Sequence, residues 1–253
     1  MLNVVNKPVD YPDNRDLHTH VQQSLLYRTV RDVKFGLLNN KLRAPRRLGA
    51  VHQLSEFITF AHSTGLTERP SFNHRKDLYR YIHDNAIGTE AIDYLEFGVF
   101  KGASMRQWIE INEKPDSRFI GFDSFEGLPE DWEGTYEKGY FSTGGQPPKI
   151  DDPRVGWVKG YFQDSLRNFL ATFDRRNRLV LHMDADLYSS TLYVLATLDE
   201  RIAPGTVIIF DEFGNVNDEF RAWIDYTSAF RRQGKPIAWA DGFYGVAAFE
   251  VTS

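Results

Sequence analysis

Four carboxylic acids directly follow two apolar segments, in the patterns Asp184-Ala185-Asp186 and Asp211-Glu212. The apolar segments, 179–183 and 207–210, are typical of buried strands in a parallel sheet. Open α/β sheets bind ligands at the carboxyl edge of their strands, so we expect the four acids to lie together there. Clustered carboxylates repel one another unless a cation compensates them. The pattern therefore favours a site for a hard divalent cation with oxygen ligands.

We expect Asp184 and Asp186 to have different roles. Residues two apart on an extended strand end face the same side, so one acid could bind the cation while the other faces a substrate. The alternative is that these acids cap the helix expected after Leu187. Capping explains one acid and leaves the other three without a role.

A further acidic motif, Glu96-x-Gly98-x-x-x-Gly102, lies at the end of the apolar segment 94–97. Its glycines permit a tight strand-to-helix turn and close approach of a ligand, although the motif alone is typical of a structural turn. The next apolar segment ends in Asp123, 27 residues after Glu96. An acid there can hydrogen-bond a ribose diol. Asp123 could instead cap the following turn, but its pairing with Glu96 favours a nucleoside ligand.

Elements that would position these residues alternate along the chain from Asp93 onward. Apolar segments that predict strands lie at 94–97, 119–122, 155–158, 179–183 and 207–210, and helical patterns lie at 104–111, 165–173, 189–201 and 218–232. This alternation predicts an α/β fold with a doubly wound, mostly parallel sheet. Segments 236–240 and 246–251, separated by a short turn, predict an antiparallel hairpin at the C-terminal edge of the sheet.

The first seventy residues show helical periodicity without strand signals, which predicts a helical extension over 1–70 and an α/β domain over 71–253. The extension's apolar stripes need burial, so we expect it to serve as a lid or as a homo-oligomer contact. Its basic stretch 28–47 is typical of a solvated helix face, the alternative being a phosphate or partner surface. Segment 126–153 is rich in glycine, proline and aromatics, and its length predicts a lid over the site.

Composition excludes several classes of protein. The chain has 253 residues, a net charge of −5 and no cysteine, which argues against nucleic acid or membrane partners and excludes disulfides and cysteine-ligated metals. No apolar run approaches the roughly 20 residues that span a bilayer. We therefore predict a cytoplasmic protein.

Five motifs, in this order, resemble the macrocin-type (TylF-like) O-methyltransferases. These are class I methyltransferases that use S-adenosylmethionine and magnesium to methylate sugar hydroxyls of natural products. The resemblance covers about 79–251, and the motifs are Leu95-Glu96-Phe97-Gly98-Val99-Phe100-Lys101-Gly102, Gly121-Phe122-Asp123-Ser124-Phe125-Glu126-Gly127-Leu128-Pro129, Lys159-Gly160-Tyr161-Phe162-Gln163-Asp164-Ser165-Leu166, Asp184-Ala185-Asp186-Leu187-Tyr188-Ser189-Ser190-Thr191 and Asp211-Glu212.

The resemblance implies roles for individual residues. For S-adenosylmethionine it implies Glu96, Gly98 and Gly102 at the methionine end, Asp123 at the ribose, Ser124 beside it and Asp164 near the adenine. For Mg²⁺ it implies Asp184, Asp211 and Glu212 as ligands, with Asp186 as the general base. Glu212 departs from the family, which often has a second Asp there, and Ser165 replaces the usual Thr.

The predicted function is O-methylation of a small-molecule acceptor, a sugar or glycoside. Magnesium would bind and acidify the acceptor hydroxyls while Asp186 removes the proton. A catechol-type O-methyltransferase is a close alternative. A non-catalytic cofactor-binding protein is disfavoured by the intact set of acids, and a metal-dependent hydrolase would leave Glu96 and Asp123 without a role.

Overall fold

The computed structural model describes residues 44–132 and 136–253. Most of the predicted extension 1–70, including most of the basic stretch 28–47, lies outside these ranges. Residues from Leu48 to Ser253 form one compact unit. The roles predicted for the extension, lid or oligomer contact, stay predictions.

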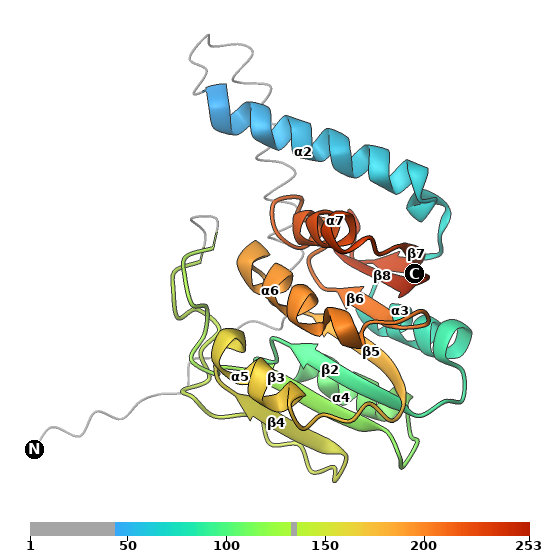
Figure 1. The fold of residues 1–253 in the computed structure, drawn as a ribbon, viewed down its shortest axis with the longest axis vertical. Helices are drawn as coiled ribbons and strands as arrows, with labels where there is room; N and C mark the ends of the chain where they lie inside the picture. Colours follow the sequence, from blue (N-terminus) through green and yellow to red (C-terminus); the bar gives the residue numbers. More distant parts are fainter. Residues whose placement is uncertain (1–43, 133–135) are drawn as a thin grey trace, which may run out of the picture. The chain divides into compact units, whose positions relative to one another are not determined.

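One eight-stranded sheet and the helices on its two faces make up the described part of the chain (Figure 1). The strands are β1 (Ser71–Phe72), β2 (Ile92–Phe97), β3 (Arg118–Asp123), β4 (Val155–Lys159), β5 (Arg178–Met183), β6 (Val207–Phe210), β7 (Gly234–Ala240) and β8 (Val246–Val251). The α-helices are α2 (Ala44–Ser63), α3 (Arg75–Ile82), α4 (Ala103–Ile111), α5 (Phe162–Leu170), α6 (Tyr188–Leu198) and α7 (Glu219–Phe230). Short helical turns follow at Leu66–Glu68, His83–Ile87 and Asp199–Arg201.

The sheet has the strand order β1-β7-β8-β6-β5-β2-β3-β4. Neighbouring strands run parallel except at β8, which is antiparallel to both β6 and β7. The predicted doubly wound, mostly parallel sheet with a C-terminal antiparallel hairpin is confirmed. The two-residue strand β1, which pairs in parallel with β7 beyond the hairpin, was not predicted because it is too short to show a pattern.

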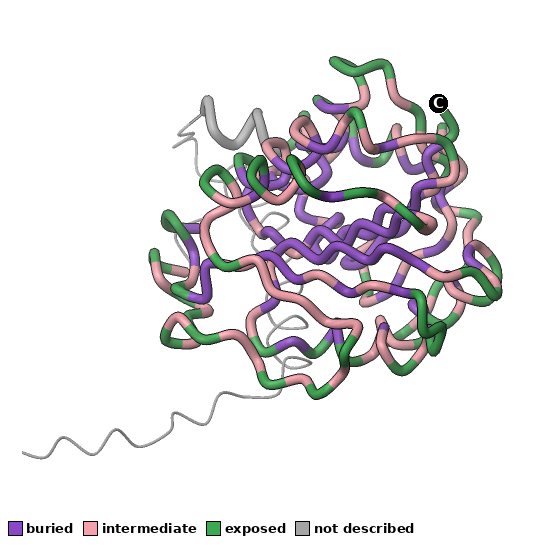
Figure 2. The backbone as a smooth tube through the Cα atoms, turned by 60° about the horizontal axis from the view of Figure 1, so that its bottom comes forward, coloured by how far each residue is buried: buried purple, intermediate pink, exposed green. Residues whose placement is uncertain are grey.

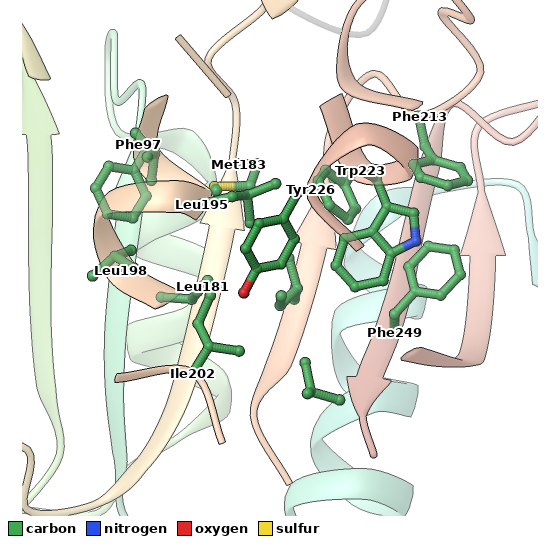
Figure 3. Close-up of a cluster of buried hydrophobic side chains, with 14 of the residues drawn as sticks. Phe97, Leu181, Met183, Leu195, Leu198, Ile202, Phe213, Trp223, Tyr226 and Phe249 are labelled. Carbon is green, nitrogen blue, oxygen red and sulfur yellow. The ribbon is translucent and has the colours of Figure 1, made fainter. Parts of the chain in front are cut away.

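Apolar side chains cover the sheet on both faces, as the nearly continuous apolar sequence of the parallel strands requires. On one face, Leu195 of α6 and Trp223 of α7 pack with Leu181 of β5 and Phe249 of β8 (Figure 3). On the other face, Trp108 of α4 lies 5.4 Å from the ring of Tyr94. Figure 2 shows the buried strands between the two more exposed helical layers.

Helix α2 adds to the first of these faces. Phe57 is fully buried, and its ring lies 6.0 Å from that of Phe213 and 5.0 Å from that of Phe220. This contact buries part of the apolar stripe that the sequence showed. No helix within 44–132 and 136–253 combines the length and apolar character needed to cross a membrane.

Candidate active site at the carboxyl edge of the sheet

Strands β2, β5 and β6 lie next to one another and bring three of the predicted acids to one edge. In the register of β2 and β5, Glu96 lies opposite His182. The ladder continues past the strand ends: the amide of Asp184 donates to the last carbonyl of β2 at 2.9 Å, and the amide of Asp211 donates to the last carbonyl of β5 at 2.9 Å. The backbone itself therefore places Asp184 and Asp211 after neighbouring strands.

The glycine motif forms the turn between β2 and α4. Gly98 has a φ of 95°, and an added Cβ would overlap the carbonyl oxygen of Asp184. Gly102 has a φ of 72° and lies directly before α4. Only glycine adopts such conformations without strain, so both positions have a structural reason to be glycine. Gly98 in particular lets the turn lie directly against the β5 edge.

Asp123 holds this turn in place. One carboxylate oxygen accepts hydrogen bonds from the amides of Val99 and Phe100, both at 2.9 Å, and the other accepts from the amide of Phe125 at 2.7 Å. Ser124 closes the adjoining turn, because its hydroxyl accepts from the amide of Glu126 at 3.0 Å. Asp123 thus joins the two loops predicted to line the cofactor site, and Ser124 stabilises the second of them.

Glu96 is fully buried and has partners inside the protein. The hydroxyl of Ser104 donates to one of its carboxylate oxygens, and the hydroxyl of Tyr94 donates to the other at 3.0 Å. Burial raises the pKa of Glu96 to about 7, although nearby His182, Ser104 and Tyr94 oppose the shift. The group predicted to face the methionine end therefore lies below the surface of the turn.

Arg75, at the start of α3, was not among the predicted site residues. Its Nη1 donates to both carboxylate oxygens of Asp211, at 2.7 and 2.9 Å, and its Nε donates to Asp241 at 3.1 Å. The Asp211 carboxylate is fully buried. Although burial lowers it, the pKa of Arg75 is raised well above its ordinary value, chiefly by Asp211. No local sequence signal pairs two residues so far apart in the chain.

Asp184 and Asp186 are both half-buried. Burial, together with repulsion from Asp211 and Asp186, raises the pKa of Asp184 well above its ordinary range. Asp186 has a φ of 57°, which is unusual for a residue with a side chain. Strained backbone of this kind occurs often at functional sites. The fold thus brings Asp184 close enough to Asp186 and Asp211 for their charges to interact.

Sequence reasoning also missed Glu219, the first residue of α7. It is fully buried, and its Oε2 accepts from the amide of Glu212 at 2.8 Å. Its Oε1 has no hydrogen-bond partner among the described residues. Burial raises the pKa of Glu219 well above its ordinary value, although the bond from Glu212 opposes the shift. The available sequence signal was an acidic residue in the first turn of a helix. Acids are common there because they interact favourably with the positive end of the helix dipole.

The described part of segment 126–153 contacts the same edge. Trp132 is 4% exposed, and its Nε1 donates to Asp218 at 3.0 Å. Leu128 and Trp132 form a buried cluster with Leu187, next to Asp186. These contacts place the predicted lid segment against the loop that carries Asp186.

Asp164, predicted to lie near the adenine, is exposed in the first turn of α5.

Comparisons with known proteins support the resemblance seen in the sequence. Residues 148–247 match the family model described as macrocin-O-methyltransferase (TylF). The structure of the O-methyltransferase NovP is similar over 71% of this chain and 80% of that chain, with 23% identity and a TM-score of 0.57. The calicheamicin methyltransferase CalS11 is similar over 98% of this chain and 99% of that chain, with 20% identity and a TM-score of 0.53. The search of curated proteins gave no match.

At these identities the two structures show a shared fold. The family match confirms the predicted TylF-like resemblance over 148–247 and, with it, the predicted enzyme class, an S-adenosylmethionine-dependent O-methyltransferase.

Proposed function

We propose that this TylF-type O-methyltransferase transfers a methyl group from S-adenosylmethionine to a hydroxyl group of a sugar or a glycosylated natural product. The observation that carries the proposal is that the glycine turn with Asp123 and the acids after β5 and β6 share one sheet edge, where Gly98 lies against Asp184. The structural neighbours NovP and CalS11, an O-methyltransferase and a calicheamicin methyltransferase by name, support this reaction class.

Residues around the glycine turn would hold the cofactor. A carboxylate has about four acceptor positions. Asp123 uses three of them for backbone amides, so one is left for a ribose hydroxyl. Gly98 and Gly102 would face the methionine end, with the buried carboxyl group of Glu96 behind them, while Ser124 and Asp164 would lie toward the ribose and adenine. When bound, S-adenosylmethionine supplies an activated methyl group.

Asp186 would serve as the general base. A sugar hydroxyl is a poor nucleophile at neutral pH, so its proton must be removed as it attacks the methyl group. Asp186 is half-buried and lies beside Leu187, which packs on Trp132 of the lid segment. That segment would exclude water and hold the acceptor oxygen in line with the methyl group.

The arrangement of the acids decides whether they could hold Mg²⁺. Oxygen donors such as those of Asp184, Asp211 and Glu212 suit Mg²⁺. As arranged, they do not fit the ion: both oxygens of Asp211 accept hydrogen bonds from Arg75, and no three potential ligands converge within 44–132 and 136–253. Magnesium bound by these three acids stays a proposal from the family resemblance, and no step of the mechanism runs through it.

Calorimetric titration with S-adenosylhomocysteine tests the cofactor site. Asp123→Asn should weaken binding about tenfold or more, because a charge-assisted hydrogen bond to the ribose is lost. Asp152→Asn is the matched control, since Asp152 also accepts from a backbone amide in a turn but pairs with Arg154 elsewhere. Equal affinity in wild type and Asp123→Asn would contradict the assignment of Asp123.

Turnover with a panel of acceptors separates the remaining alternatives. Methylation of sugars or glycosides supports the proposal. Methylation of catechols alone would favour a catechol-type O-methyltransferase. Cofactor binding without turnover would favour a non-catalytic binding protein. Hydrolysis without cofactor binding would favour a metal-dependent hydrolase.

We further propose a cytoplasmic location and an oligomer contact or lid formed by residues 1–70. Val51 and Ile58 of α2 are 45% and 47% exposed, which supports a further contact on this helix. Sedimentation of the full chain and of Ile58→Lys tests the contact. Identical masses for the two proteins, both monomeric, would contradict an oligomer through α2.

A further inference from the structure

Asp218, the residue directly before α7, has a buried side chain that does not cap the helix. An aspartate in this position ordinarily accepts from the free amides of the first helical turn. The Asp218 carboxylate instead accepts three hydrogen bonds from elsewhere. Its Oδ2 accepts from Nε1 of Trp132 at 3.0 Å and from Nδ2 of Asn215 at 2.8 Å, and its Oδ1 accepts from the amide of Tyr188 at 3.0 Å. One carboxylate therefore joins the segments that follow β3, β5 and β6.

Two of these bonds reach the residues that follow Asp186. The side chain of Leu187 lies in one buried cluster with Trp132, and the next residue supplies the Tyr188 amide. Asp186 itself has a φ of 57°. A residue with a side chain keeps such a conformation only where the surrounding structure holds it. Asp218 contributes to that hold on the C-terminal side of Asp186.

The third bond extends the connection to the loop after β6. Asn215, whose side chain donates to Asp218, also donates its backbone amide to the carbonyl of Glu212 at 2.8 Å. The loop that carries Asp186 and the loop that carries Glu212 are therefore fixed to the same carboxylate.

We propose that Asp218 is a positioning residue for methyl transfer: it holds the backbone at Asp186 so that this carboxylate meets the acceptor's hydroxyl group. It does so through the amide of Tyr188 and through Trp132. The inference rests on the proposed function, which assigns Asp186 as the general base. All three partners of Asp218 are donors, and the amide nitrogen of an asparagine could accept from none of them. In Asp218→Asn at least one donor therefore loses its acceptor, and the strained loop is released.

A double-mutant cycle on turnover tests the proposal in the full chain. The acceptor is the sugar or glycoside that the wild type methylates fastest. Asp218→Asn should lower kcat about tenfold or more, because a small displacement of a catalytic group costs a large factor in rate. The affinity for S-adenosylhomocysteine should stay the same. In the Asp186→Asn background, the same substitution should lower kcat by less than about threefold, since the group that it positions is already lost.

Asp93 offers a matched control. It is also a buried aspartate, and it accepts from the backbone amides of Arg176 and Asn177 at 2.9 and 3.2 Å. It lies at the opposite ends of the strands, as the second residue of β2. Asp93→Asn should therefore destabilise the fold, and any effect on kcat should be the same with and without Asp186→Asn.

Hydrogen exchange measured by mass spectrometry tests the same connection without an acceptor. Trp132→Phe keeps an aromatic ring beside Leu187 but removes the bond to Asp218. The amides of 186–188 should exchange about three- to tenfold faster, which corresponds to the loss of one hydrogen bond, while those of β6 stay unchanged. Trp239→Phe is the control, because Nε1 of Trp239 is buried without a hydrogen-bond partner in the described part of the chain. It should leave exchange at 186–188 unchanged.

Each outcome decides between the possibilities. Equal effects of Asp218→Asn in the two backgrounds, or unchanged exchange at 186–188 in Trp132→Phe, overturn the positioning role. If Asp218→Asn fails to fold, Trp132→Phe decides by both criteria. Full turnover in Asp186→Asn would show that the general base of the proposed function is wrong, whereas a loss there with none in Asp218→Asn contradicts the positioning role alone. If no acceptor is methylated, the exchange measurement decides by itself.

Discussion

Tyr94 and His182 share a buried hydrogen bond of 2.6 Å between the tyrosine oxygen and Nδ1. The hydroxyl of Tyr94 donates to Glu96 at 3.0 Å, and in the His182 tautomer with its proton on Nδ1 the tyrosine oxygen accepts that proton. On its other side, Nε2 of His182 lies 3.4 Å from the hydroxyl of Tyr79 and 3.6 Å from Asp211. A continuous buried polar chain thus connects Glu96 with Asp211 across β5.

Loss of the Tyr94 hydroxyl should destabilise the protein. Tyr94→Phe leaves Nδ1 of His182 and one oxygen of Glu96 buried without their partner, so we expect a loss of about 1–3 kcal/mol in the free energy of unfolding. Tyr226→Phe is the control, because it removes a 2.8 Å bond to Asp199 from a less buried place. Urea denaturation measures both. A loss for Tyr94→Phe no larger than that for Tyr226→Phe would show that the buried chain adds nothing to stability.

Glu96 should make the stability of the wild type fall as the pH rises. The pKa of Glu96 is raised to about 7 in the folded protein from an ordinary 4.5, so the folded state holds this proton more tightly than the unfolded state. Its contribution is fully present below pH 4.5 and is lost as the pH rises through 7, by about 3 kcal/mol in total.

Urea denaturation of wild type and Glu96→Gln between pH 4.5 and 8 checks this expectation. The difference in stability, wild type minus variant, should decrease steadily over the range, since the variant has no proton to lose. The control is Glu110→Gln, which removes an exposed carboxyl group on α4. A difference that stays constant with pH would contradict the raised pKa of Glu96.

Alanine should not be tolerated at Gly98. The φ of 95° and the overlap of a Cβ with the carbonyl oxygen of Asp184 would force the turn away from β5, at a cost of about 3 kcal/mol or more. Gly156 in β4 is the matched control, since its backbone is ordinary and nothing lies within 4 Å of an added Cβ. We expect Gly156→Ala to change stability by about 1 kcal/mol or less. Thermal and urea denaturation measure the stability of both variants. Equal losses of stability in the two would mean that the turn can move to accommodate a Cβ at Gly98.

Two substitutions should separate the roles of Asp184 and Asp186. Asp186→Asn keeps the size of the side chain but cannot accept the acceptor's proton, so turnover should fall by about 10²–10⁴-fold while the affinity for S-adenosylhomocysteine stays the same. On the proposal from the family resemblance that Asp184 is a magnesium ligand, Asp184→Asn should weaken metal binding, and high magnesium should partly restore its rate. Initial rates over a range of magnesium concentrations measure both. Restoration of Asp186→Asn alone would mean that the two roles are reversed.

Much of the fold was predictable because its signals are local. Each of the parallel strands β2 to β6 contains a short apolar run, and the parallel arrangement itself puts the following residue, such as Asp184 or Asp211, at a known edge. The hairpin of β7 and β8 was equally visible from two runs with a short turn between them.

The partners of the acids were not predictable, because they depend on tertiary contacts. Arg75 is an ordinary basic residue at the start of a helix, and nothing near it in sequence points to Asp211. The position of Glu96 near the end of a strand was predicted correctly. The sequence could not show that hydroxyl groups of the protein itself donate to both of its carboxylate oxygens. Glu219 resembled a routine acid of a first helical turn, although it is fully buried against Glu212.

The strand order has a consequence for how the chain folds. Strands β2, β3 and β4 are consecutive in sequence and neighbours in the sheet, so they can pair as soon as they meet. The outer pair, β1 with β7, joins Ser71 to Trp239, and closing such a long loop costs more entropy than pairing consecutive strands. Arg75 lies just after β1 and Asp241 just after β7. We therefore expect strands β2 to β4 to pair early in folding. The ion pairs of Arg75 with Asp211 and Asp241 should be among the last contacts to form.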